Sequence, residues 1–420
     1  MIIKNIEAIP LNMQYDPELA PHLIRSGLTA FNNRMTLYRV ELEGGAVGYG
    51  DQMGGPDDVS AFIGRQAIAG LVEIRHPGVQ MACYDAVGRA LDLPVHALMG
   101  RQVRSRVPFA YWTPEIPAEM WADQTRKAVG LGYRVYKTKC RPWFDPIEQV
   151  EQAAAVAPGG FRFWLDFNGH LRNVRQALPV LQALSRYDIV AGFESPIPQR
   201  DAEGYRSLRA RIDRPIAAHY GSGCCHVRSD RSYDPGVPAR TQIVKGLCDG
   251  FVLGAPDVFT IRQQDAVAAE ARLPFWVQTI GSGLRAAWVA HLVSTCRQAE
   301  LSSLAAHTIW ETDITRLPEP VAGWLPVPEG PGLGVEVDEE AVEMLRRAPV
   351  PEVKRRIDTV VYPDGTEWHF GDETQRHEAY HFGSAPGFVR GVRLTTREDD
   401  GSADFAELFE CCSKEPVLSG

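Results

Sequence analysis

From about Val107 onward the chain alternates between short apolar runs and amphipathic stretches, and this alternation restricts the possible folds more than any other feature. The runs that resemble buried strands are Val107–Trp112, Arg134–Cys140, Phe161–Phe167, Val190–Ser195, Pro215–Tyr220, Gly250–Ala255, Pro274–Thr279 and Ala305–Trp310. Helical patterns near residues 117–131, 145–157, 173–186, 201–212, 237–247, 257–271 and 283–298 separate them. Eight strands with helices between them predict a parallel (β/α) barrel. A doubly wound open sheet is the alternative, but no glycine-rich nucleotide-binding sequence follows the first run.

Polar residues stand at the ends of the predicted strands, where (β/α) barrels carry their chemistry. Asp166, Glu194 and His219 end three consecutive strands and are separated by 28 and 25 residues. Neighbouring strand ends would bring these groups within reach of one cation. A hard divalent ion such as Mg²⁺ prefers oxygen ligands, so Asp and Glu fit and His fits less well. Further polar residues at or near strand ends, which we predict as substrate-binding residues, are Asn168, Tyr220, Gln278 and Glu311.

Two lysines lie two positions apart on the second predicted strand. Side chains at i and i+2 of a strand point to the same face, so Lys137 and Lys139 should project together. Two ammonium groups on one buried face repel each other, and burial disfavours their charged forms. Both effects lower a lysine pKa toward a value useful to a general base. The pair therefore predicts a catalytic element.

The first 105 or so residues have a mixed α+β pattern. Met35–Leu42 alternates and is followed by a turn and the short segment Ala46–Gly50, which predicts a hairpin. The stretch from about Val79 to Leu98 is helical in pattern and is closed by Gly100. Tyr15–Asn33 is long for a plain connection, and such segments are often lids over a site or disordered.

Composition excludes several classes of partner. The formal net charge is −9 and no basic patch is evident, which argues against nucleic acid and anionic membrane as partners. No apolar run approaches the ~20 residues that span a bilayer. The N-terminus lacks a signal-peptide core, and the 8 cysteines include no Cys-x-x-Cys pair. We therefore expect a cytoplasmic protein with reduced thiols.

Several motifs, in this order, resemble the enolase superfamily in its mandelate racemase/muconate lactonizing enzyme branch. They are Tyr136-Lys137-Thr138-Lys139, Leu165-Asp166-Phe167-Asn168-Gly169, Phe193-Glu194-Ser195-Pro196, Pro215-Ile216-Ala217-Ala218 and Gly330-Pro331-Gly332-Leu333-Gly334-Val335. The stretch from Cys83-Tyr84-Asp85-Ala86 to Leu98-Met99-Gly100 is similar to the capping domain of that family. The resemblance covers roughly residues 1–345.

The resemblance implies a modified (β/α)₇β barrel under an α+β capping domain. The boundaries we expect are residues 1–105 for the N-terminal capping part, 106–320 for the barrel, 321–349 for the return to the capping domain and 350–420 for an added β-rich extension. It also implies a small-molecule carboxylate substrate, Mg²⁺ held by three acidic residues, and removal of a proton α to the carboxylate. Asp166 and Glu194 match two metal ligands, Lys139 matches the base and Lys137 its electrostatic partner.

The sequence departs from the family pattern at three positions. His219 stands where the third acidic ligand belongs; it would ligate a metal softer than Mg²⁺, or act as an acid or a plain polar group at a site without metal. Gly254 and Gln278 occupy the sixth and seventh strands, where other members carry a second base. Two-base racemisation is therefore not expected. The insertion Gly221–Pro235 contains Cys224-Cys225-His226, whose adjacent cysteines have poor spacing for zinc and fit a rebuilt loop better.

These departures leave more than one function open. The first is a one-base lyase, most simply a dehydratase, acting on a hydroxy acid or acid sugar. The alternatives are a cycloisomerase or epimerase, and a repurposed, non-catalytic relative that binds a carboxylate. Beyond residue 350 the sequence predicts β-rich runs around the turn Tyr362–Thr366, with frayed residues from Cys411 to Gly420. The extension would serve as an oligomer contact, in a homo-oligomer, or as a cover over the site.

Overall fold

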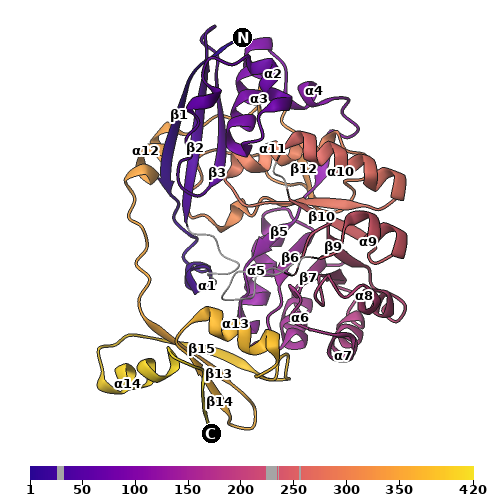
Figure 1. Cartoon of the computed structure of the whole chain (residues 1–420), viewed down its shortest axis with the longest axis vertical. Helices are drawn as coiled ribbons and strands as arrows, with labels where there is room; N and C mark the ends of the chain where they lie inside the picture. The colour runs from indigo at the N-terminus through magenta and orange to yellow at the C-terminus, as the bar shows by residue number, and fades with distance from the viewer. Residues whose placement is uncertain (26–32, 224–233, 235, 255–256) are drawn as a thin grey trace.

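The computed structural model describes residues 1–25, 33–223, 234, 236–254 and 257–420. Three antiparallel strands near the N-terminus form one sheet: β1 (Ile3–Asn12), β2 (Arg34–Leu42) and β3 (Val47–Met53). The predicted hairpin is thus confirmed. Helix α3 (Pro77–Leu91) packs closely on this sheet, because Gly48 presents no side chain where Ala82 and Ala86 approach it. Helix α2 (Ala67–Glu73) and the 3₁₀ turn η1 (Ser60–Phe62) complete this region, whereas α1 (Ala20–Arg25) lies away from the sheet, beside the barrel and near the C-terminal residues (Figure 1).

The helix expected over Val79–Leu98 is interrupted. Asp92 adopts the left-handed conformation with φ of 55° and ends α3, and Pro94 follows it. The shorter α4 (Val95–Met99) then begins. A left-handed residue followed by proline cannot continue a helix, so the periodic pattern spans two helices rather than one.

In the described part of the chain, seven parallel strands follow in sequence order and form a curled sheet. They are β5 (Tyr111–Thr113), β6 (Val135–Lys139), β7 (Arg162–Asp166), β8 (Val190–Glu194), β9 (Ile216–His219), β10 (Gly250–Gly254) and β11 (Phe275–Gln278). The helices between them are α5 (Ala118–Gly130), α6 (Pro146–Ala154), α7 (Val174–Ser185), α8 (Ala202–Arg209), α9 (Ala239–Lys245), α10 (Val258–Ala271) and α11 (Gly283–Ser294). The predicted α/β barrel class is confirmed (Figure 1).

The first and last predicted barrel strands differ from expectation. Val107–Trp112 is divided between β4 (Arg106–Pro108), which pairs with β12 (Trp324–Pro326), and β5. Ala305–Trp310 is not a strand. Ala306 has a φ of 46°, which breaks extended backbone, and the 3₁₀ turn η2 (His307–Ile309) follows it. Single bridges join Ser303 to Phe109 and Leu304 to Gln278, so isolated residue pairs stand where an eighth strand was expected.

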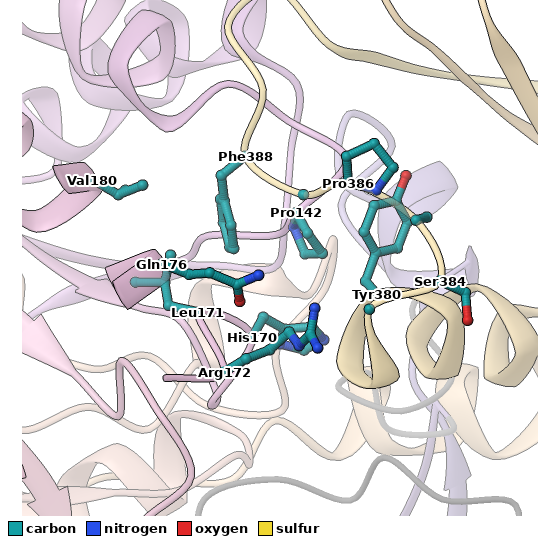
Figure 2. A pocket seen from close by; sticks show the side chains of 13 residues that line it. Pro142, His170, Leu171, Arg172, Gln176, Val180, Tyr380, Ser384, Pro386 and Phe388 are labelled. Atoms are coloured by element: carbon teal, nitrogen blue, oxygen red, sulfur yellow. The ribbon is translucent and has the colours of Figure 1, made fainter. Parts of the chain in front are cut away.

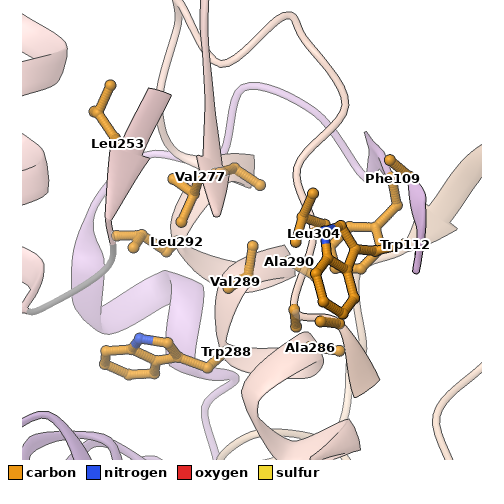
Figure 3. Packing of buried hydrophobic residues seen from close by; sticks show 14 of the residues in the cluster. Phe109, Trp112, Leu253, Val277, Ala286, Trp288, Val289, Ala290, Leu292 and Leu304 are labelled. Carbon is orange, nitrogen blue, oxygen red and sulfur yellow. The ribbon is translucent and has the colours of Figure 1, made fainter. Parts of the chain in front are cut away.

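Side chains alternate between the inside and the outside of the curled sheet. On the inside, a cluster of Trp164, Ala217, Val252 and Trp276 fills the barrel below the strand ends. On the outside, β10 and β11 pack against the buried helix α11. Figure 3 shows Leu253 and Val277 lying over that helix. The filled interior leaves only the next inward positions, toward the strand ends, free for chemistry.

The last 65 residues form a separate layer beside the barrel (Figure 1). After α12 (Glu339–Arg347), which packs on β1, the chain runs to a four-stranded sheet of order β15-β13-β14-β16. Its strands are β13 (Arg356–Val361), β14 (Glu367–Phe370), β15 (Arg393–Glu398) and β16 (Val417–Ser419), with helices α13 (Glu373–Phe382) and α14 (Ala403–Cys412). The predicted turn at Tyr362–Thr366 joins β13 and β14. The expected fraying of the last residues is wrong, because β16 pairs with β14.

Two barrel residues belong to the hydrophobic core of this extension. Trp143 and Phe144, in the segment after β6, are buried with Val360, Phe370 and Tyr380 of the extension. The backbone N–H of Phe388 donates to the carbonyl of Pro142, 2.8 Å away. The extension therefore shares its core with the barrel. None of the helices in the described residues is long and apolar enough to cross a membrane.

Candidate active site at the carboxyl end of the barrel

Three neighbouring strands bring the predicted lysines and carboxylates to one level of the barrel. In the parallel register, Lys139 of β6 is opposite Asp166 of β7, and Asp166 is opposite Glu194 of β8. All three residues end their strands and point inward. The 28-residue separation of Asp166 and Glu194 thus corresponds to one β-α-β unit, as the sequence predicts.

Both lysines reach the same carboxylate oxygen. Lys137 Nζ donates to Asp166 Oδ2 at 2.9 Å, and Lys139 Nζ donates to the same atom at 2.5 Å. Lys137 Nζ also lies 3.2 Å from Glu194 Oε2. All four side chains are buried, and the two carboxylates balance the two ammonium groups. The prediction that the lysines share one face is confirmed.

The electrostatic environment separates the two lysines. Burial, with the positive charges of Lys137 and Arg141, lowers the pKa of Lys139 to about 8, although Asp166 opposes the shift. Burial also acts against the charge of Lys137, but Asp166 and Glu194 outweigh it and raise the pKa of Lys137. The expectation that both lysine pKa values fall is therefore wrong for Lys137, because it touches two carboxylates rather than one. Despite its burial, the lysines hold the pKa of Asp166 well below its usual range.

His219 lies beside Glu194 at the end of β9. Its Nε2 is 3.2 Å from Glu194 Oε1. The backbone holds this position firmly, since the N–H of His219 donates to Gln199 Oε1 and its carbonyl accepts from Gln242 Nε2, both at 2.8 Å. Asp166, Glu194 and His219 thus offer two carboxylates and an imidazole from consecutive strands. This donor set suits a divalent cation.

The positions facing Lys139 across the barrel carry no titratable group. Gly254 ends β10, and a Cβ placed on it would meet no atom within 4 Å. Gln278 ends β11, and its Oε1 accepts from Trp276 Nε1 at 3.2 Å. Among the described strand ends, the space opposite the lysines is thus open and without a second base.

The remaining predicted substrate-binding residues are placed differently. Asn168 lies near the lysine cluster; its N–H donates to Asp166 Oδ1 at 2.9 Å and its Oδ1 accepts from Arg141 at 3.0 Å. Tyr220 packs edge-on against Phe251, at 5.1 Å between ring centroids, on the opposite side of β9 from His219. Glu311 is exposed, and its N–H donates to the carbonyl of Gln14. The structure therefore brings Asn168 to the cluster but not Tyr220 or Glu311.

Sequence reasoning missed two buried charged residues at this end of the barrel. Arg141 is fully buried two positions beyond Lys139, and its Nε lies 3.8 Å from Glu115 Oε2 in the segment after β5. The alternation that selected Lys137 and Lys139 extends to Arg141, so the signal was present. The predicted cluster Cys224-Cys225-His226, in contrast, lies outside the described residues, as does part of the Tyr15–Asn33 segment.

A cavity of about 440 Å³ lies between the barrel and the extension. Figure 2 shows His170 and Arg172, after β7, on one side and Tyr380 and Ser384 of the extension on the other. The carbonyl of Phe382 accepts from Arg172 at 3.2 Å. The extension thus borders the segments that follow β6 and β7, next to the lysine cluster.

Comparison with known proteins gives consistent relatives. A family model described as "Enolase C-terminal domain-like" matches residues 120–220. An N-succinyl-L-Arg/Lys racemase of Bacillus cereus is 21% identical over 269 residues, which are 64% of this chain and 70% of that protein. A D-galactonate dehydratase of Variovorax paradoxus is 27% identical over 302 residues, 65% of this chain and 73% of that protein.

A solved structure supports the same fold. The mandelate racemase/muconate lactonizing family protein from Azoarcus sp. EbN1 superimposes with a TM-score of 0.65 at 22% identity, covering 83% of this chain and 98% of that chain. The match over residues 120–220 and the curated relatives support membership of the enolase superfamily, in its mandelate racemase/muconate lactonizing enzyme branch, and the solved structure shows the same fold.

Proposed function

We propose that this protein removes a proton α to a carboxylate with a single base, Lys139, and acts as a lyase of the dehydratase type on a hydroxy acid or acid sugar. The observation that carries this proposal is the buried cluster in which Lys137 and Lys139 contact Asp166 and Lys137 also lies beside Glu194, an arrangement that shifts the two lysine pKa values in opposite directions. A lysine whose pKa is about 8 is partly neutral near pH 7 and can accept a proton. Lys137, whose pKa is raised, stays charged. Pairs of titratable groups shifted in opposite directions are typical of acid–base sites.

The residues also fit the divalent metal that the family implies. Glu194 Oε2 is buried and makes no hydrogen bond with any residue that the structure describes, although Lys137 Nζ is 3.2 Å away, and the donor set includes Asp166 and His219. Asp166, Glu194 and His219 would hold Mg²⁺ or another divalent ion. When bound, the cation supplies positive charge where the carboxylate of an enediolate develops its own negative charge.

This chain's residues then have separate tasks. The substrate enters on the open side over Gly254, with its α-carbon toward Lys139. Lys139 takes the α-proton, and Lys137 stabilises the developing negative charge from within the barrel. His219, the most exposed member of the cluster at 24% of its side chain, lies where it can complete the metal set or protonate a leaving hydroxyl. With no base facing Lys139 among the described strand ends, only one face of the substrate is deprotonated.

Relatives of this chain include a racemase and a dehydratase, so similarity alone leaves the reaction type open. Because Lys139 is the one base proposed for the site, elimination is favoured over racemisation. A second candidate function is carboxylate binding without proton removal. It is favoured by the balance of charges at the site, because Lys137 and Lys139 already neutralise Asp166 and Glu194 without a metal ion. The carboxylate of a ligand would then bind to the two lysines and not to a metal.

The two candidates differ in a measurement that needs no knowledge of the product. The protein is incubated in D₂O with a panel of hydroxy acids and acid sugars, with excess Mg²⁺ or Mn²⁺, and exchange of the α-proton is followed by NMR together with dehydration. We expect exchange or elimination for a subset of acids of one configuration. Lys139→Met should lower the rate by about 10²–10⁴-fold, the usual contribution of a general base. Lys245→Met, at an exposed lysine on α9, is the matched control and should not change it.

The proposal fails if no acid in the panel exchanges its α-proton while several bind, because the binding function would then account for the site. It also fails if Lys139→Met retains full activity. Exchange of both epimers at similar rates would show a second base and refute the one-base reaction.

A further inference from the structure

Three potential metal ligands meet where the extension docks on the barrel. Glu373 and His377 stand one turn apart on α13, and Glu115 follows β5 in the barrel. One ligand atom from each lies within 4.8 Å of the other two. Glu115 and His377 are buried, and the side chain of Glu373 is 12% exposed. A Glu and a His at i and i+4 of a helix present their ligand atoms on the same face.

A chain of hydrogen bonds determines which nitrogen of His377 carries its hydrogen. The carbonyl of Phe167 can only accept, so His170 Nδ1, 2.9 Å away, must be the donor. In the neutral ring, His170 Nε2 is then an acceptor. It lies 3.1 Å from His377 Nδ1, which must donate to it. The neutral His377 therefore has its lone pair on Nε2.

This lone pair points into the carboxylate cluster. His377 Nε2 is buried and has no hydrogen-bond partner among the described residues, and it lies 3.7 Å from Glu373 Oε1. Both atoms are acceptors, so their approach inside the protein is unfavourable unless a cation lies between them. Two arginines border the carboxylates: Arg141 Nε lies 3.8 Å from Glu115 Oε2, and Arg356 Nη2 lies 3.9 Å from Glu373 Oε2. Neither donates a hydrogen bond to His377 Nε2, which has no partner among the described residues.

We propose that Glu115, Glu373 and His377 form a second metal site, which binds Zn²⁺ or a similar transition-metal ion and fastens the extension to the barrel. One imidazole with two carboxylates suits zinc better than Mg²⁺, whose ligands are almost all oxygens. The hydrogen bond from His377 to His170 is the outer support that metal-bound histidines commonly have. The site is separate from Asp166, Glu194 and His219 and does not rest on the proposed function.

Zinc stoichiometry tests this site in the full-length protein. The chelator-treated protein is titrated with Zn²⁺ in excess Mg²⁺ by calorimetry, and bound zinc is counted by elemental analysis after gel filtration. His377→Gln and Glu373→Gln should each bind one zinc equivalent fewer than the wild type. Glu378→Gln, on the same helix but lining a different pocket, is the matched control and should keep the full number. Any zinc bound at the barrel carboxylates is counted equally in the wild type and in each variant, so it does not affect the difference between them.

Thermal unfolding supplies a second readout. Zinc should raise the unfolding midpoint of the wild type and of Glu378→Gln by several degrees, because a ligand bound only to the folded state stabilises it, and should not raise that of His377→Gln. If the helix variants fail to fold, Glu115→Gln removes a ligand from the barrel side and should also lose one equivalent. Equal zinc counts in the wild type and all three ligand variants would overturn the proposal, as would a wild type that binds no zinc.

Discussion

The core shared between the barrel and the extension predicts an unusually large effect for one substitution, Trp143→Ala. Trp143 is completely buried. Its ring lies edge-on to His377 at 4.8 Å and to Tyr380 at 5.5 Å between centroids, and the Arg376 guanidinium lies 4.4 Å from its ring centroid. One side chain of the barrel thus contacts three residues of α13.

The expected magnitude follows from these contacts. Replacing a buried Trp by Ala costs about 3–5 kcal/mol, and a desolvated cation–π contact adds up to about 2 kcal/mol. Trp143→Phe should cost much less, about 1 kcal/mol. A Phe keeps most of the ring packing. It also removes the Trp143 Nε1–H, a buried donor that has no hydrogen-bond partner in the described part of the chain and costs about 1–3 kcal/mol to bury. The order of stability should be wild type, then Phe, then Ala.

Urea unfolding gives the free energy of unfolding of each variant, and hydrogen exchange locates the change. We expect the amides of α13 and of the segment after β6 to exchange faster in Trp143→Ala, with the N-terminal sheet unaffected. Trp324→Ala is the matched control, since Trp324 is 43% exposed. If Trp143→Ala destabilises the protein no more than Trp324→Ala does, the shared core does not hold the extension in place.

Two further predictions concern stability away from the site. Burial lowers the pKa of His291 from 6.5 to about 4, so this histidine takes up a proton in the unfolded chain first as pH falls. The contribution of neutral His291 to the free energy of unfolding is fully present above pH 6.5, and about 3 kcal/mol of it is lost by pH 4. Urea unfolding at pH 7.5 and 4.5 should show this loss in the wild type, and a loss of the same size in His291→Gln would contradict it. Gly48→Ala should cost about 3 kcal/mol or more, because its Cβ would lie 2.1 Å from the Ala86 backbone nitrogen. Gly44→Ala, in open space, is the control, and equal unfolding midpoints for the two variants would refute the steric reasoning.

Local sequence patterns were sufficient for the lysine cluster. Strand alternation placed Lys137 and Lys139 on one face, and the repeated β-α-β spacing placed Asp166 and Glu194 beside them. The roles of these residues stay predictions. Local patterns failed where a single backbone conformation decides the outcome, as at Ala306, whose positive φ replaces the last expected strand by a turn.

The contacts of the extension had no local signal. Trp143 and Arg141 lie in a short connection after a strand, and nothing near them in the sequence indicates that α13 covers them. The residues of α13 that pack on them come after the whole barrel in the sequence. Long-range packing of this kind depends on the whole fold, so Glu115 and His377 could be associated only once the structure was known.

The position of the extension in the sequence also has a consequence for synthesis on the ribosome. Tyr380 is made 237 residues after Trp143. At ~5–20 residues per second, about 10–50 s pass before the partner of Trp143 exists. During that time Trp143 and Phe144, in the segment that follows Lys139, lack the extension residues that cover them and are accessible to chaperones and to other nascent chains. The carboxyl end of the barrel therefore reaches its final form only after the extension has been made, so a chain terminated before the extension would carry the lysines but not their finished surroundings.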